Sequence, residues 1–241
     1  MTFDRRRWAL SRPIRRIAQI AAATLVTGLG GRLAAAAERI LIDPSQILST
    51  ARLIAFKGVN SYALEQGPSG PALRSTPNGS ASGLYEEVNV EGRDLRWIQW
   101  SWRVERLHLS ADVRDLSRED FGAALMFVFG EPSFFNRDVP TLAYVWTSTP
   151  LANGARIASR RFQSLHYFQL RGQSDVGIWQ AEVRDVAADY RAVFGHEPPM
   201  LKYIAVFNDN DQTGEDTSAL FGSVHQPAHA YDQGHTRDGV R

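Results

Sequence analysis

Short runs of alternating apolar and polar residues, separated by turn residues, fill most of the chain. In residues 97–104, one set of alternate positions holds Ile98, Trp100, Trp102 and Val104. Successive side chains of a strand point to opposite faces of its sheet. This run therefore predicts a strand with one face in an apolar core and the other turned outward.

Residues 121–129 are apolar on both faces of a strand, which predicts a position in the middle of a sheet. Other short runs recur up to the C-terminal part of the chain, and each predicts a strand. They cover residues 60–65, 72–75, 83–90, 141–146, 162–171, 178–184, 201–207 and 218–224. A stretch rich in glycine and proline follows the first of these runs and predicts a hairpin or a short loop.

One segment has the pattern of a helix. Residues 186–194 place apolar residues on one helical face, Asp185 precedes them as an N-cap, and Gly195 follows as a stop. Residues 44–53 are expected to form a short helix or an irregular turn. About ten short strands with so little helix predict a mainly all-β fold, a single β-sandwich of jelly-roll type.

The first 37 residues have the features of an export signal. A basic head precedes an alanine-rich apolar stretch that ends at Ala35–Ala37, as at a signal-peptidase site. Arg5 and Arg6 resemble a twin-arginine motif. We expect a cleaved signal over residues 1–37, a domain over residues 38–224, and a periplasmic or secreted protein without stable membrane insertion. An uncleaved membrane anchor is the alternative.

Removal of this segment changes the net charge. The whole chain is formally +1, but residues 1–37 hold seven of its 27 Lys and Arg and one of its 26 Asp and Glu, which leaves a net charge of about −5. Nucleic-acid binding needs a basic surface that neutralises phosphates, so we expect no such partner. The chain has no cysteine, which excludes disulfides and thiolate chemistry. Residues 225–241 lack periodicity and predict a disordered tail.

Several motifs occur in the order found in one bacterial family. They are "SASGL", "LRWIQWSWRVE", "REDFGAALMFVF", "LAYVW", "IWQAEVRDVAADYRAVFGHEPP" and "NDNDQTGEDTSALFGSV". Over residues 56–224 the chain resembles the exported proteins grouped as the domain of unknown function 3047 family. The resemblance implies an exported β-sandwich and no established activity. Gln212 replaces an asparagine of the family pattern, and Ser223 stands where the closing strand usually has an aspartate.

The last motif contains a candidate metal loop. Asp209, Asp211 and Thr213 occupy alternate positions before a glycine, like the first half of a calcium loop, but the glutamate that closes such a loop is missing. The simplest interpretation is a solvated Asx-type turn. The alternatives are direct ligand binding and a structural calcium. The candidate calcium ligands are Asp209, Asp211, Thr213 and Asp216.

The tryptophans are the second candidate feature. The apolar C–H face of a sugar stacks on an aromatic ring, while polar side chains hold its hydroxyl groups. If Trp100 and Trp102 face the core, their neighbours on the same strand face outward. The candidate ligand-binding residues are Trp97, Gln99, Arg103, Trp146 and Trp179, and burial in the core is the alternative for the tryptophans.

No catalytic signature is complete, and we predict no catalytic residue. Glu86 and Glu87 are adjacent on a strand and point to opposite faces, which is unsuitable for a hydrolytic pair. Solvation is the simpler explanation for a polar loop that contains Asp112, Asp115, Glu119 and Asp120. We expect a non-catalytic module that binds a glycan or another envelope component. A polysaccharide hydrolase and an envelope protein that binds a partner through a sheet edge are the alternatives.

Overall fold

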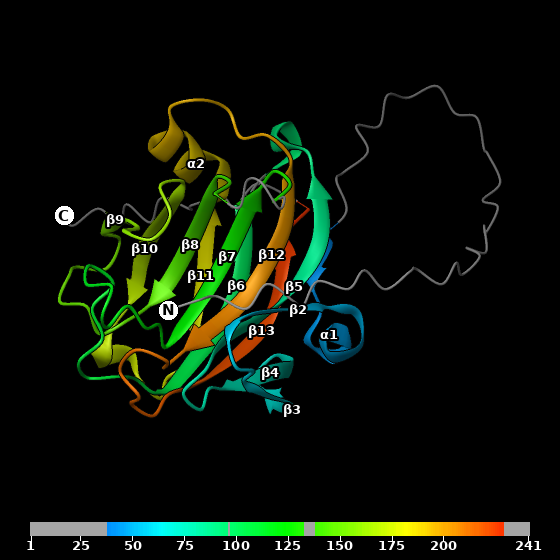
Figure 1. The fold of residues 1–241 in the computed structure, drawn as a ribbon. Helices are drawn as coiled ribbons and strands as arrows, with labels where there is room; N and C mark the ends of the chain where they lie inside the picture. Colours follow the sequence, from blue (N-terminus) through cyan, green and yellow to red (C-terminus); the bar gives the residue numbers. More distant parts are fainter. Residues whose placement is uncertain (1–37, 96, 133–137, 229–241) are drawn as a thin grey trace, which may run out of the picture. The chain divides into compact units, whose positions relative to one another are not determined.

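The computed structural model describes residues 38–95, 97–132 and 138–228. The predicted signal peptide and residues 229–241 of the predicted tail lie outside these ranges. Within them, thirteen strands form two sheets that pack face to face around one main core (Figure 1). This architecture confirms the predicted β-sandwich of jelly-roll type.

The six-stranded sheet has the order β11-β6-β13-β4-β3, and β1 pairs with β13 beside this path. Its strands are β1 (Arg39–Ile42), β3 (Ser61–Gly67), β4 (Gly70–Thr76), β6 (Trp97–Arg106), β11 (Gln180–Asp185) and β13 (Ser218–Gln226). All of its pairs are antiparallel. Because β13 runs to Gln226, the first two residues of the predicted tail belong to the sheet instead.

The seven-stranded sheet has the order β2-β5-β12-β7-β8-β10-β9. Its strands are β2 (Arg52–Lys57), β5 (Ala81–Val90), β7 (Ala123–Phe129), β8 (Thr141–Trp146), β9 (Arg156–Ala158), β10 (Leu165–Arg171) and β12 (Leu201–Asp209). Only β8 and β10 pair in parallel among its described strands. The central place of β7 confirms the prediction from its two apolar faces.

Two α-helices, α1 (Pro44–Thr50) and α2 (Val186–Phe194), accompany the sheets, with two 3-10 turns at Gly92–Asp94 and Gln173–Asp175. The predicted caps of α2 are confirmed. The side chain of Asp185 accepts the backbone N–H of Ala188 at 2.9 Å, and Gly195 leaves the helix in the left-handed conformation with a φ of 77°. No helix in the described ranges is long and apolar enough to span a membrane.

The core fills the space between the inner faces of the two sheets. The predicted inner face of β6 is confirmed, since its four apolar residues are at most 3% exposed. Trp146 of β8 is also fully buried, against the ring of Trp102 at a centroid distance of 5.8 Å. Its indole N–H donates to the carbonyl of Gly172 at 3.0 Å. The prediction of Trp146 as a ligand-binding residue is therefore wrong, because its side chain lies on the inner face of a central strand.

A smaller apolar cluster covers part of the outer face of the seven-stranded sheet. It contains Ala81, Val113, Phe121, Ala124, Ala143, Val145, Tyr167 and Phe207. Val113 and Phe121 belong to the loop between β6 and β7, whereas the other six lie on strands. The cluster therefore holds this loop against the sheet near the end of β12.

Candidate functional site

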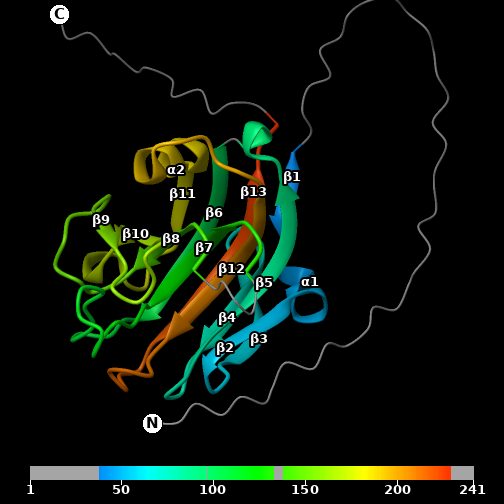
Figure 2. The ribbon, with the colours of Figure 1, turned by 45° about the horizontal axis from the view of Figure 1, so that its top comes forward.

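Three aspartates meet where β12 ends. Asp209 is the last residue of β12, Asp211 lies in the turn that follows, and Asp120 lies in the loop before β7. One carboxylate oxygen from each lies within 4.8 Å of the other two. In Figures 1 and 2 the orange turn after β12 lies next to the green loop that leads into β7. We call these residues the aspartate cluster.

Asp120 closes the turn after β12. Its carboxylate accepts the backbone N–H groups of Gln212 at 3.3 Å and of Thr213 at 2.7 Å. The solvated loop expected from the sequence is wrong for Asp120, which is fully buried, and also for Asp112 and Glu119, which are at most 6% exposed. The sequence shows only that Asp120 lies just before a strand. That strand, β7, pairs antiparallel with β12, and such pairing brings the start of one strand next to the end of the other.

Asp209 is the most constrained of the three carboxylates. It accepts the backbone N–H of Phe121 at 2.7 Å and is 5% exposed. Burial, and then the charge of Asp120, raise the pKa of Asp209 well above its usual range. The same two causes raise the pKa of Asp211. The cluster therefore favours a bound proton or a bound cation over three uncompensated charges.

Buried polar atoms beside these carboxylates have no hydrogen-bond partner among the described residues. They include Asp211 Oδ1, Gln212 Oε1 and His108 Nδ1. Nε2 of His108 lies 2.8 Å from the carbonyl oxygen of Asp209, so it is the nitrogen that donates. Burial lowers the pKa of His108, which keeps the ring neutral. A buried acceptor without a donor is costly, and carboxylate and amide oxygens are the atoms that a hard cation binds.

The other two predicted calcium ligands have different surroundings. Thr213 lies next to the cluster, where its N–H binds Asp120 and its hydroxyl accepts the N–H of Glu215 at 3.2 Å. The side chain of Asp216 is 81% exposed and faces Arg106 at 3.4 Å. The structure does not bring Asp216 to the cluster, contrary to our expectation, because the turn directs it toward β6.

Two basic side chains lie at the rim of this region. Lys57 Nζ lies 3.8 Å from Asp211, and Arg161 pairs with Glu119 at 2.9 Å. The hydroxyl of Tyr167 also donates to Glu119, at 2.7 Å. These contacts balance the negative charge at the rim. The cluster itself stays largely buried, which suits a structural cation better than a carboxylate pair that must reach a glycosidic bond.

The second candidate site lies on the outer face of the six-stranded sheet. Trp97, Gln99 and Arg103 are half-buried there, on the side of β6 that faces away from the core, as predicted. Trp179 directly precedes β11, whose first residue pairs with Trp102 of β6. Its ring reaches the β3–β4 hairpin, since Cζ2 lies 3.3 Å from the position that a Cβ on Gly67 would take.

A crevice of about 70 Å³ lies beside the half-buried Trp179 ring. It is lined by the polar side chains Ser101, Ser223 and Asp43 and by the β3–β4 turn. Gly222 also lines the crevice, and a Cβ there would clash with Ser101 Oγ, so a larger residue would have to displace that hydroxyl. The structure thus places an aromatic ring next to hydroxyl and carboxylate groups at the sheet surface.

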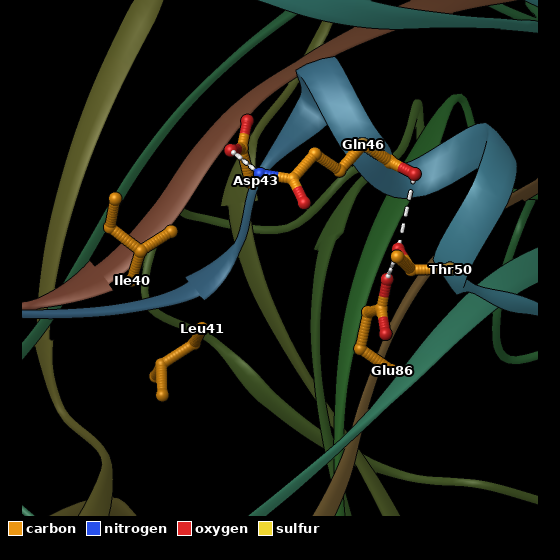
Figure 3. A pocket seen from close by; sticks show the side chains of 6 residues that line it. All are labelled: Ile40, Leu41, Asp43, Gln46, Thr50 and Glu86. Atoms are coloured by element: carbon orange, nitrogen blue, oxygen red, sulfur yellow. Dashed lines mark hydrogen bonds between the residues drawn. The ribbon is translucent and has the colours of Figure 1, made fainter. Parts of the chain in front are cut away.

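A larger recess of about 320 Å³ lies between β1, α1 and β5 (Figure 3). Most of its polar groups are already bound. Asp43 accepts the N–H of Ser45 at 2.9 Å and the amide of Gln46 at 3.0 Å, while the hydroxyl of Thr50 donates to Glu86. These bonds cap α1 and tie its end to β5, so the recess is explained by the anchoring of the helix.

The family described as "Protein of unknown function (DUF3047)" matches residues 51–225. The chain belongs to this family. The resemblance noted in the sequence is thereby confirmed. No curated protein matches this DUF3047 chain.

Several solved structures are similar to this DUF3047 protein. A cellulase derived from Cel12A of Rhodothermus marinus has 10% identity and a TM-score of 0.40, over 73% of this chain and 100% of that one. A family 11 carbohydrate-binding module of Clostridium thermocellum, in complex with a mixed-linked tetrasaccharide, has 10% identity and a TM-score of 0.37, over 82% and 99%. The glycoside hydrolase domain of Endo-D from Streptococcus pneumoniae R6 has 8% identity and a TM-score of 0.38, over 74% of this chain and 22% of that one. Similarity at this level does not extend to ligand or activity.

Proposed function

We propose that this DUF3047 protein is an exported, non-catalytic carbohydrate-binding module of the cell envelope. The observation that carries the proposal is Trp179, a half-buried ring beside a crevice with the hydroxyl side chains Ser101 and Ser223. Stacking on the C–H face of a sugar needs an accessible aromatic ring, and orientation of the sugar needs polar groups next to it. The surface at Trp179 combines the two.

The same face continues along β6. Trp97, Gln99 and Arg103 lie on the same face of one strand, and at about 3.3 Å per residue the six steps from Trp97 to Arg103 span about 20 Å. That length suits an oligosaccharide better than a single sugar. Arg103 donates to Glu105 at 2.6 Å, and its side chain is 33% exposed. Trp97, Gln99, Arg103 and Trp179 are therefore the proposed sugar contacts.

We also propose that the aspartate cluster holds a structural calcium ion. Asp120, Asp209 and Asp211 would supply carboxylate oxygens, and Gln212 Oε1 is a further buried oxygen beside them. The two raised carboxyl pKa values support the proposal, since a divalent cation would compensate the charges that burial disfavours. The ion would join the turn after β12 to the loop before β7.

A glycan array tests the sugar-binding proposal. The wild-type protein should bind at least one class of oligosaccharide, and Trp179→Ala should lose that binding while its melting temperature changes little. Phe56→Ala is the matched control, because Phe56 is 58% exposed but lies on β2 of the other sheet. Absence of binding by the wild type, or equal binding by Trp179→Ala, contradicts the proposal. Release of shortened products from a bound oligosaccharide contradicts its non-catalytic part.

A further inference from the structure

Edge strand β3 exposes an apolar side chain on the inner face of its sheet. Leu64 of β3 pairs with Leu73, which is fully buried in the core, so Leu64 lies on the inner face of its sheet. Its side chain is nevertheless 44% exposed. In the same way Leu53 of β2 pairs with the core residue Leu84 and is 47% exposed. Inner-face leucines on both edge strands therefore reach solvent.

These leucines lie on one side of the sandwich, which we call the open side. Helix α1, β2 and β3 lie together there in both ribbon views (Figures 1 and 2), and α1 contacts β3 and β5. α1 buries Ile47, but it leaves Leu48 49% exposed. The open side thus combines exposed apolar side chains with the outer edge of β3, with which no strand of the described residues pairs.

The other sheet edges in the described ranges carry features that discourage pairing. β2 ends at Lys57 and has a register break before it, and β9 has only three residues. α2 packs against β11, and β1 has four residues and a register break. β3 pairs with β4 in an unbroken register over seven residues and contains neither lysine nor proline. Its single charge, Glu65, is already paired with Arg74 at 2.8 Å. An edge this regular is a template for another strand.

We propose that β3 pairs with β3 of a second copy of this chain, so that two sandwiches join through their six-stranded sheets. A two-fold antiparallel pairing centred on Leu64 places Ala63 opposite Glu65 of the other copy and Tyr62 opposite its Gln66. The two copies of Glu65 do not lie opposite each other in this pairing, and each keeps its ion pair with Arg74. The pairing satisfies the free backbone groups of both edges and covers the two copies of Leu64.

The test measures the mass of the purified protein by light scattering after size exclusion, over a wide range of concentration. The wild type should be a dimer, and Leu64→Lys should be a monomer because it places a charge at the centre of the pairing. Leu109→Lys is the matched control: Leu109 is 79% exposed and lies in the loop after β6, so this variant should stay dimeric. A monomeric wild type, or a dimeric Leu64→Lys variant, overturns the proposal.

Hydrogen exchange of the wild-type backbone provides a measurement that needs no variant. Amide groups of residues 61–67 should exchange more slowly as the protein concentration rises, while those of β9 and β2 should not change. Equal exchange of residues 61–67 at all concentrations contradicts the pairing. Protection that arises only on addition of another envelope protein would also overturn it, because the occupant would then be a different chain. The proposal is independent of sugar binding at Trp179.

Discussion

Replacement of Asp211 by asparagine should change stability in opposite directions without and with calcium. The carboxylates of Asp120, Asp209 and Asp211 approach within 4.8 Å. At this separation and an effective dielectric constant of about 20, two full charges repel by about 3.5 kcal/mol. Bound protons relieve part of this in the wild type, so Asp211→Asn in chelator should stabilise the protein by about 1–2 kcal/mol.

Calcium should make the wild type more stable than the Asp211→Asn variant. An ion that binds only the folded state adds about 2.7 kcal/mol of stability at a concentration one hundred times its Kd. For a domain of about 190 residues, 1 kcal/mol corresponds to about 2–4 °C in Tm, so the wild type should gain about 5–11 °C. Asp211→Asn lacks one carboxylate ligand and should gain less than about a quarter of this, so that the wild type becomes the more stable protein in calcium.

Thermal unfolding followed by circular dichroism measures the Tm of the wild type and of Asp211→Asn, each with chelator and with calcium. Asp216→Asn is the matched control, since it removes an exposed carboxylate two residues after Gly214 and outside the cluster. Its calcium response should equal that of the wild type. A wild-type Tm that calcium leaves unchanged, or a calcium response of Asp211→Asn as strong as that of the wild type, would refute a cation bound by these three carboxylates.

Three further variants test the fold and the crevice. Trp146→Ala should lower the free energy of unfolding by about 3–5 kcal/mol in urea titrations, because it empties a fully buried site; a loss below about 1 kcal/mol would contradict the assigned burial. Asp185→Ala should cost about 0.5–2 kcal/mol in the same titrations through loss of the α2 cap, and no change would show that the cap is dispensable. Gly222→Ala should weaken sugar binding by about tenfold, or 1.4 kcal/mol, in calorimetric titrations, since the added methyl group displaces Ser101; unchanged affinity would remove the crevice from the site.

Local pattern was sufficient for most strands and for the one predicted helix. Alternation along β6 identified its inner face, and the two apolar faces of β7 identified its central place. Strands β1, β2 and β9 escaped prediction for a physical reason. β9 has three residues and β1 has four, while β2 is exposed along almost all its length and so shows no alternation of buried and exposed positions.

The candidate sites were only partly predictable, because they depend on contacts between distant parts of the chain. Asp209 and Asp211 could be named from their spacing, but Asp120 joins them only through the pairing of β7 with β12. Trp146 was misassigned because both faces of β8 are apolar, so the sequence does not show which face is inner. Asp216 fitted the spacing of a calcium loop, yet the actual turn directs it to Arg106.

Fluorine NMR of the protein labelled with 5-fluorotryptophan tests the central claim, sugar contact at Trp179, most directly. The chain has six tryptophans, and Trp179→Phe assigns the decisive resonance. On titration with oligosaccharides selected on the glycan array, the Trp179 resonance should shift with saturation. The resonances of the buried Trp100, Trp102 and Trp146 should stay in place. A titration that moves no resonance, or that leaves Trp179 unmoved while others shift, would contradict sugar binding at this face.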